Sequence, residues 1–330
     1  MALEFLESFG QYGAGTYTSS AGFEGVWSVG GEFKIADLGG GRKAAYSDYY
    51  TTAYMDHGLS TDYSTIIVGF RLHSTAWGSK ALVQFYDDTS CLGSITMTTG
   101  GQIAYAASSN PVVNVRHTST ASVGAATHVT VKVVFSNSVG EVYIYFDGVL
   151  DSYGTTLDTI GGGTQCDMIR LAKTGSSTRI SDLYVDSDTV HGDRNVAWDP
   201  SDSSGVSSDF TATGDTNNED CVDETPADDD TTYNRSTTST DKDSLGHSSP
   251  PSMATVVAVQ EMVRARKEDA NDGSIKVGTR YSSNESQSSS LSLDTTYKYV
   301  WEIFEDVPGG SGWTAAEVEA AESSYENVSV

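Results

Sequence analysis

The segment from residue 128 to residue 153 alternates between apolar and polar side chains more regularly than any other part of this 330-residue chain. Its apolar residues fall on one face of each of two extended stretches: Val129, Val131, Val133 and Phe135, then Val142, Ile144 and Phe146. Successive side chains of a strand point to opposite sides, so this period of two predicts a hairpin that turns near Gly140. Asp147 and Gly148 predict a second tight turn.

Other strand-length runs surround this hairpin. They begin at residue 63, and Gly100 and Gly101 separate two of them in the manner of a hairpin turn. Residues 167–172 and 180–185 predict two more strands, and no helix-length amphipathic segment occurs before residue 190. We therefore predict an antiparallel β-sandwich over residues 1–190.

The composition changes near Asp186. Residues 191–250 are rich in Asp, Ser, Thr and Gly, which is typical of a disordered linker. Apolar residues, including Trp198 and Phe210, nevertheless recur there, so we expect an extended, partly ordered acidic segment that packs against something. Residues 251–330 are expected to form a smaller β-rich domain that includes a long strand within residues 254–269.

The C-terminal sequence predicts one short helix, over about residues 315–323. Thr314 and Glu317 have the spacing of a capping box, and Trp313 and Val318 have that of a hydrophobic staple. The expected fold class is therefore all-β, with a sandwich followed by a smaller β-rich domain and a short C-terminal helix.

The charge of the chain limits its partners. Asp and Glu number 45 against 19 Lys and Arg, which gives a net charge of -26. A chain this acidic is repelled by nucleic acids and by anionic membrane surfaces, so we predict no nucleic-acid partner. The longest apolar runs are only as long as strands, so we predict no membrane insertion. The N-terminal sequence lacks the pattern of a signal peptide, which favours synthesis and folding in a cytoplasm. The three cysteines match no zinc motif and are interpreted as unpaired thiols.

No motif predicts catalysis. The carboxylates of residues 228–230 lie in loop-like sequence rather than on a strand with the spacing of a glycosidase, and are interpreted as a solvated acidic surface. The histidines have neither a metal-binding spacing nor a neighbouring nucleophile motif. We therefore predict a protein that is not an enzyme.

Candidate binding residues fall into three groups. Calcium is the only cofactor left open, at a loop site that does not follow the EF-hand pattern, and a solvated acidic turn is the alternative. Its candidate ligands are Asp182, Asp186, Asp188 and Asp193. Candidates for contact with a glycan or a protein partner are Tyr46, Tyr49, Tyr50 and Tyr54, for which half-buried strand positions are the alternative. Trp198 and Phe210 are the candidates for a docking surface.

The order of strands from "IIVGFRL" through "GEVYIYFDGVL" to "RISDLYV" resembles the concanavalin A-like sandwich in its laminin-G-like form. The acidic segment, the second β-domain and the "WTAAEV" helix resemble the C-terminal part of bacteriophage virion proteins. This resemblance implies a non-enzymatic structural component of a virion, docked on the tail, its tip or the capsid surface. The implied partners are other virion proteins and copies of the chain itself. The alternative function is a host-adsorption module that binds a surface glycan, with or without calcium.

Overall fold

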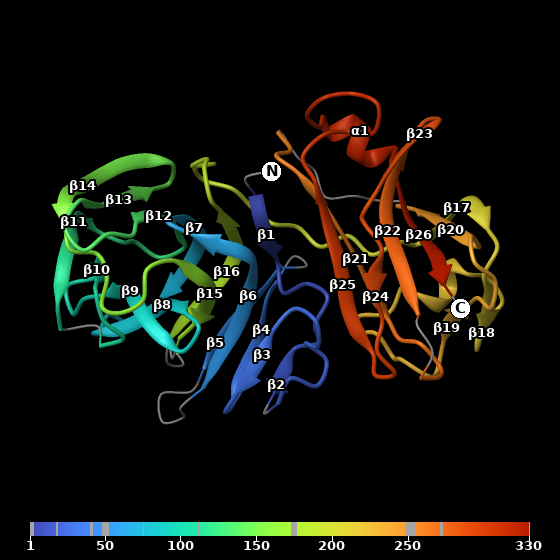
Figure 1. Ribbon diagram of the computed structural model, residues 1–330, viewed down its shortest axis with the longest axis horizontal. Helices are drawn as coiled ribbons and strands as arrows, with labels where there is room; N and C mark the ends of the chain where they lie inside the picture. Colours follow the sequence, from blue (N-terminus) through green and yellow to red (C-terminus); the bar gives the residue numbers. More distant parts are fainter. Residues whose placement is uncertain are drawn as a thin grey trace. The chain divides into compact units, whose positions relative to one another are not determined.

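The computed structural model describes residues 3–17, 19–39, 42–47, 53–74, 76–110, 113–172, 177–247, 255–270 and 273–329. These residues form antiparallel strands with one short α-helix and one 3₁₀ turn, which confirms the predicted all-β class. The chain divides into two compact units, which Figure 1 colours mainly blue to green and mainly yellow to red. Unit 1 comprises Met1–Phe9, Ala14–Ala21 and Trp27–Ala197, and unit 2 comprises Gly10–Gly13, Gly22–Val26 and Trp198–Val330.

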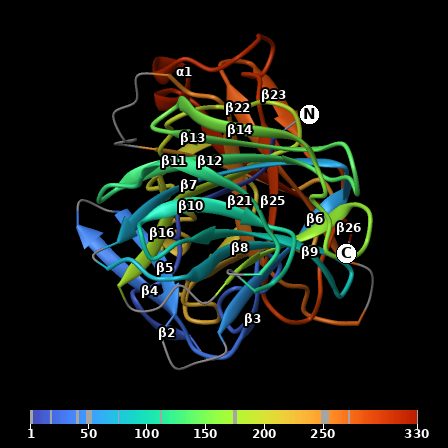
Figure 2. The same cartoon turned by 90° about the vertical axis from the view of Figure 1, so that its left-hand side faces the viewer.

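Unit 1 is an antiparallel sandwich whose described residues form a nine-stranded and a seven-stranded sheet (Figures 1 and 2). The larger sheet contains β1 (Leu3–Glu7), β2 (Gly15–Tyr17), β4 (Phe33–Gly39), β5 (Arg42–Ser47), β7 (Thr65–Ser74), β12 (Thr127–Val134), β13 (Gly140–Phe146), β14 (Val149–Leu157) and β16 (Thr178–Asp186). The order is β14-β13-β12-β7-β16-β5-β4-β2, with β1 also on β16. The smaller sheet contains β3 (Ser28–Gly30), β6 (Tyr54–Tyr63), β8 (Lys80–Asp87), β9 (Ser90–Met97), β10 (Gln102–Ala106), β11 (Val115–Ser122) and β15 (Cys166–Leu171), in the order β11-β10-β9-β8-β15-β6-β3.

The predicted hairpin is confirmed. Strands β12 and β13 pair in the register that joins Val131 to Ile144, and the apolar face of each strand is buried in the sandwich core. Asp147 and Gly148 both have positive φ, at 47° and 81°, which is the geometry that a two-residue turn between twisted strands requires. Phe135, just beyond β12, meets Phe85 of the other sheet edge-on at 5.6 Å, so the two sheets bury one shared core.

Unit 2 is built from smaller sheets. Its six-stranded sheet contains β17 (Ser203–Ser208), β20 (Lys242–Gly246), β22 (Ser274–Tyr281), β23 (Asn284–Gln287), β24 (Leu291–Ser292) and β26 (Glu322–Ser329). The order is β17-β20-β26-β22-β23, with β24 also on β22. Two strand pairs complete the described part of this unit: β18 (Thr211–Thr213) with β19 (Tyr233–Arg235), and β21 (Val259–Ala265) with β25 (Lys298–Phe304). The predicted strand within residues 254–269 corresponds to β21.

The acidic segment is not a separate extended element, in contrast to our expectation for residues 191–250. Most of it folds into unit 2, where it supplies β17 to β20 and the 3₁₀ turn η1 (Glu219–Cys221). Asp243 of β20 is completely buried and accepts hydrogen bonds from the Tyr325 hydroxyl (3.0 Å), the Asn218 amide (2.6 Å) and the Phe210 backbone N–H (2.9 Å). A buried carboxylate with three donors holds this polar sequence in place without a large apolar core.

Unit 2 also contains two short pieces from near the N-terminus. Tyr12 and Phe23 are almost fully buried, with ring centroids 4.2 Å apart, and Tyr12 meets Tyr299 of β25 edge-on. The Tyr299 backbone N–H donates to the Glu24 carbonyl oxygen at 2.7 Å. The expected assignment of residues 1–190 to a single domain therefore differs from the structure at these two pieces.

The C-terminal helix is shorter than predicted. The capping box between Thr314 and Glu317 is present, but α1 spans only Ala315–Glu319, and the chain enters β26 at Glu322. Pairing of β26 with both β20 and β22 accounts for the early end, because it gives the backbone more partners than another helical turn would. No helix in the described part of the chain is long and apolar enough to cross a membrane.

Candidate binding sites

The four aspartates predicted as metal ligands do not converge on one point. Asp182 is buried and paired with Arg42 (2.5 Å) and Arg71 (3.4 Å), whereas Asp188 is exposed. Within the described ranges, no group of three or more His, Cys, Asp or Glu side chains is arranged to hold a metal ion. The structure therefore gives these aspartates no common calcium site.

Two of these aspartates instead bind residues 187–197, which we call the covering segment. The Asp186 carboxylate accepts from the backbone N–H groups of Asp188 and Thr189 and lies 2.7 Å from Nε2 of His191. Burial opposes ionisation of Asp186, but these hydrogen bonds outweigh it and lower its pKa. Asp182 accepts from the Val196 N–H at 3.1 Å. The predicted acidic turn is thus a set of attachments between β16 and the segment that follows it.

The predicted tyrosine group is only partly described. Tyr49 and Tyr50 lie outside the described residues. Tyr46 is in β5 of the nine-stranded sheet, 5.3 Å from the Arg179 guanidinium, whereas Tyr54 begins β6 of the seven-stranded sheet. The two described members therefore belong to different sheets.

Tyr54 takes part in a cluster on the face of the seven-stranded sheet that points away from the core, which we call the outer face. Strand pairing aligns Arg170 with Asp56 on one side and with Gln84 on the other, while alternate residues such as Ile169 are buried in the core. The Arg170 guanidinium stacks on Tyr54 at 4.0 Å and on Tyr86 at 4.5 Å. The close approach of the Tyr54 ring to Gly30 of β3 leaves no room there for a Cβ atom.

Asp56 fixes the orientation of Arg170. Its carboxylate oxygens accept from Nε at 2.5 Å and from the second terminal nitrogen at 2.7 Å, while the first terminal nitrogen donates to the Tyr86 hydroxyl at 3.0 Å. Burial alone would lower the pKa of Arg170, but the hydrogen bonds and charge of Asp56 outweigh it and raise the pKa. The pair is therefore a rigid, neutral unit of planar polar groups with aromatic rings beside it.

A loop after β10 closes one side of this cluster. The Gln84 amide donates to the Ser109 carbonyl oxygen at 3.1 Å, and the Ser94 hydroxyl donates to the Ser108 carbonyl oxygen at 2.7 Å. Arg170 and Asp56 remain accessible, with 22% and 14% of their side-chain surfaces exposed. Only Tyr54 was predicted from the sequence, because its partners Arg170 and Tyr86 come from strands far away along the chain.

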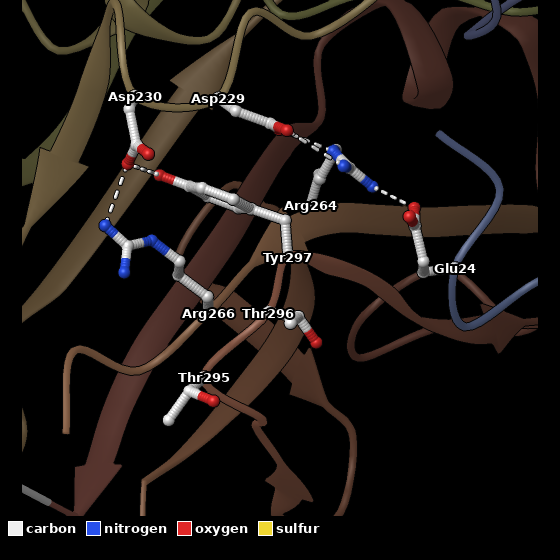
Figure 3. Close-up of a pocket in the computed structure, with 8 residues that line it drawn as sticks. All are labelled: Glu24, Asp229, Asp230, Arg264, Arg266, Thr295, Thr296 and Tyr297. Atoms are coloured by element: carbon white, nitrogen blue, oxygen red, sulfur yellow. Dashed lines mark hydrogen bonds and ion pairs between the residues drawn. The ribbon is translucent and has the colours of Figure 1, made fainter. Parts of the chain in front are cut away.

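Asp229 and Asp230, interpreted from the sequence as solvated acids, instead form ion pairs in unit 2 (Figure 3). Asp229 is paired with Arg264, at 2.6 Å to Nε and 3.0 Å to a terminal nitrogen, and Asp230 is paired with Arg266 at 2.8 Å. Glu24 binds the remaining terminal nitrogen of Arg264 at 3.0 Å. These residues surround an open recess of about 260 Å³, which we call the unit 2 recess and which is also lined by Thr295, Thr296 and Tyr297.

The docking candidates are partly buried within the chain. Phe210 packs against the apolar core of unit 2 and meets Tyr325 edge-on at 5.0 Å, so it stabilises its own unit rather than forming a docking surface. Trp198 is half-buried, and its indole N–H has no hydrogen-bond partner among the described residues. The docking role of Trp198 stays a prediction.

Two cysteines and one serine of the described chain have surroundings that do not favour nucleophilic attack. Burial raises the pKa of the Cys91 thiol to about 11 and that of Cys166 to about 12, so both remain protonated at neutral pH. His247 lies between Asp199 (3.4 Å) and the Ser323 hydroxyl (3.0 Å), in the order of a serine hydrolase. Ser323 is in the middle of the six-stranded sheet with strands paired on both sides, which is unlike the exposed turn that presents a nucleophile.

Comparison with known proteins gives structural similarity alone. No protein-family model and no curated protein matches the sequence. Domain 4 of AbnA, an extracellular arabinanase from Geobacillus stearothermophilus solved with arabinotriose, is 15% identical, with a TM-score of 0.38 over 56% of this chain and 92% of that chain. Carbohydrate binding module CBM66 from Bacillus subtilis is 12% identical, with a TM-score of 0.33 over 50% of this chain and 97% of that chain. The binding domain of botulinum neurotoxin DC, solved with SialylT, is 11% identical, with a TM-score of 0.36 over 57% of this chain and 48% of that chain.

Proposed function

We propose that this protein is a non-enzymatic glycan-binding protein that recognises a neutral saccharide on the outer face of the seven-stranded sheet. The observation that carries the proposal is the Arg170 guanidinium, held by Asp56 and stacked between Tyr54 and Tyr86. Planar side chains fixed in this way can offer paired hydrogen bonds to neighbouring hydroxyl groups of a sugar, and aromatic side chains can pack on its C–H faces.

Unused hydrogen-bonding capacity supports this proposal. Arg170 has five N–H donors, and the contacts to Asp56 and Tyr86 use three of its nitrogens once each. A ligand that brings several hydroxyl groups would satisfy donors that are already fixed in place, at little cost in side-chain entropy.

The charge balance favours a neutral ligand. Asp56 cancels the charge of Arg170, and the chain as a whole carries a net charge of -26. A uronic acid or another anionic sugar would therefore meet no uncompensated positive charge in this cluster, and would be repelled by the remainder of the protein. Neutral hexoses and pentoses avoid this penalty.

The biological setting that we propose is the surface of a bacteriophage. The resemblance of the acidic segment and C-terminal domain to virion proteins supports an accessory protein assembled with other virion proteins and with copies of itself. In that setting, glycan binding would serve adsorption to the host. Immunogold labelling of purified particles tests it: label at the tail end supports adsorption, and label spread over the head supports a capsid decoration role. Particles without label would contradict the virion assignment.

A glycan panel tests the binding site itself. We expect binding to a neutral saccharide that weakens by about tenfold in Tyr54→Ala and in Asp56→Asn, since a stacked ring or a charged hydrogen bond each contributes about 1–2 kcal/mol. Tyr46→Ala is the matched control, because Tyr46 also lies beside an arginine but in the other sheet. Measuring glycan binding in the presence of calcium and in the presence of a chelator shows whether binding depends on calcium. Equal binding by all variants, or none to any neutral glycan, would contradict the proposed site.

A further inference from the structure

The floor of the unit 2 recess is rigid. Only 11% of the Arg264 side chain is exposed, and its guanidinium lies over the rings of Tyr297 (5.6 Å) and Tyr299 (5.2 Å). Burial would lower the pKa of Arg264, but hydrogen bonds with Asp229 and Glu24 outweigh it and raise the pKa. Arg264 is therefore fixed and charged, with its charge compensated by two carboxylates.

The rim of the recess, in contrast, carries polar atoms without partners. Thr295 and Thr296 are exposed at this rim, and Nε of Arg266 has no acceptor among the described residues. Asp230 receives both Arg266 and the Tyr297 hydroxyl on a single oxygen, Oδ1, at 2.8 and 3.1 Å. Figure 3 shows Tyr297 and Asp230 pointing toward one another, with Arg266 beside them.

We propose that the unit 2 recess is a second saccharide-binding site, which takes one neutral sugar residue. Its lining presents both donors and acceptors, as a polyhydroxylated ligand requires. Its volume of about 260 Å³ is below the roughly 300–1,000 Å³ of sites that enclose drug-sized ligands, which suits a single sugar ring. Three carboxylates and two guanidinium groups leave one net negative charge, so an anion is disfavoured.

This inference goes beyond the proposed function, because the recess and the Arg170 cluster belong to different units and share no residue. Two sites on one chain would bind a repeating polysaccharide more tightly than either site alone, provided that one polymer can reach both. The recess is accordingly tested in the full chain carrying Tyr54→Ala, which weakens the sandwich site about tenfold, so that binding in the titrated range comes from the recess.

The probes are neutral trisaccharides of glucose, galactose, mannose and arabinose, titrated calorimetrically. We expect saturable binding of at least one of them to the Tyr54→Ala chain. Adding Thr296→Trp, which fills the recess, should abolish it, and adding Thr295→Val should weaken it about fivefold, as expected for the loss of one hydrogen bond. Thr216→Trp is the control, because Thr216 is an exposed residue of unit 2 outside the recess. Both threonines of the recess are exposed, so these changes should not prevent folding.

The outcomes separate the two sites. Binding to the Tyr54→Ala chain that is unchanged by Thr296→Trp would overturn the recess proposal, as would the absence of binding to the Tyr54→Ala chain. If the wild-type chain binds and Tyr54→Ala does not, the sandwich site stands and the recess fails. If Tyr54→Ala binds as well as the wild-type chain and Thr296→Trp abolishes binding, the recess stands and the sandwich site fails.

Discussion

The two units bury ionisable groups that respond to pH in opposite directions. In unit 1, burial lowers the pKa of His128 to about 4, so the folded unit holds a neutral imidazole. In unit 2, burial raises the pKa of Glu261, so the folded unit favours a protonated carboxyl group. Desolvation is the common cause, and the sign differs because it penalises the charged form of a base in one case and of an acid in the other. Acid should therefore make the contribution of His128 to the stability of unit 1 less favourable, and that of Glu261 to unit 2 more favourable.

The units also differ in what holds them together. The sandwich of unit 1 buries a large apolar core between two large sheets. Unit 2 relies on buried polar groups such as Asp243, on the ion pairs of Arg264, and on aromatic residues from the N-terminal pieces. Unit 2 should accordingly be the more sensitive to the loss of a single long-range contact.

The largest expected effect tests this dependence of unit 2. Phe23→Ala removes a completely buried ring that packs on Tyr12, and should lower the free energy of unfolding of unit 2 by about 3–5 kcal/mol. Urea unfolding with pulsed proteolysis measures this, since the protected fragments identify the unit that has unfolded. Thr16→Ala, an exposed change in β2, should leave both units unchanged. Equal stability of unit 2 in Phe23→Ala would show that its core does not need the N-terminal pieces.

Local patterns predicted the elements of unit 1 that depend on near neighbours. Alternation predicted β12 and β13 together with their buried face, and positive φ at Asp147 and Gly148 follows from residue preferences in tight turns. The capping box of α1 is also local, since Thr314 and Glu317 are three residues apart. The predicted end of α1 was wrong, because that end depends on the strands with which β26 pairs, and no local sequence pattern indicates these partners.

The candidate sites depend on strand order, which the sequence does not reveal. Arg170 meets Asp56 because β15 lies between β6 and β8, although these two residues are 114 positions apart in the chain. Asp229 similarly meets Arg264 across the fold of unit 2. The composition of the acidic segment favoured carboxylates that are exposed to solvent. A composition gives the number of charged residues but does not show which of them form ion pairs.

The second largest expected change is a loss in the free energy of unfolding of unit 1 when the pH is lowered. His128 is fully buried, and neither ring nitrogen has a hydrogen-bond partner among the described residues. An unfolded histidine has a pKa near 6.5, so as the pH falls toward 4 the unfolded chain gains a proton that the folded chain does not. This proton uptake should cost unit 1 about 3 kcal/mol of its free energy of unfolding. The charged groups around His128 that bear on this titration are Asp193, Arg71, Asp182 and Asp147.

His128→Phe should remove that acid sensitivity. A phenyl ring keeps the near-parallel arrangement of His128 with Tyr184, whose centroid lies 5.9 Å away, but takes up no proton. Urea unfolding should show the variant close to the wild type at pH 8 and more stable than it at pH 4.5. An identical loss of stability on acidification in both proteins would assign the acid sensitivity to other groups, of which Asp186 and its attachment of the covering segment are the first to test.

The smallest expected change in the free energy of unfolding concerns Glu261. Its contribution to stability changes with pH in the direction opposite to that of His128. Its carboxylate is buried and accepts from the Ser323 hydroxyl at 2.6 Å. Because its folded pKa is raised, the stabilising effect of the protonated form is complete below the unfolded pKa and is lost as the pH rises through the folded value. Glu261→Gln keeps an acceptor for Ser323 without a charge, so it should stabilise unit 2 at pH 8 by on the order of 1 kcal/mol and have little effect at pH 4. If Glu261→Gln instead destabilises unit 2 at pH 8, the carboxylate is stabilised there as an ion by its neighbours, His247 foremost, and desolvation does not set the pH response of this unit.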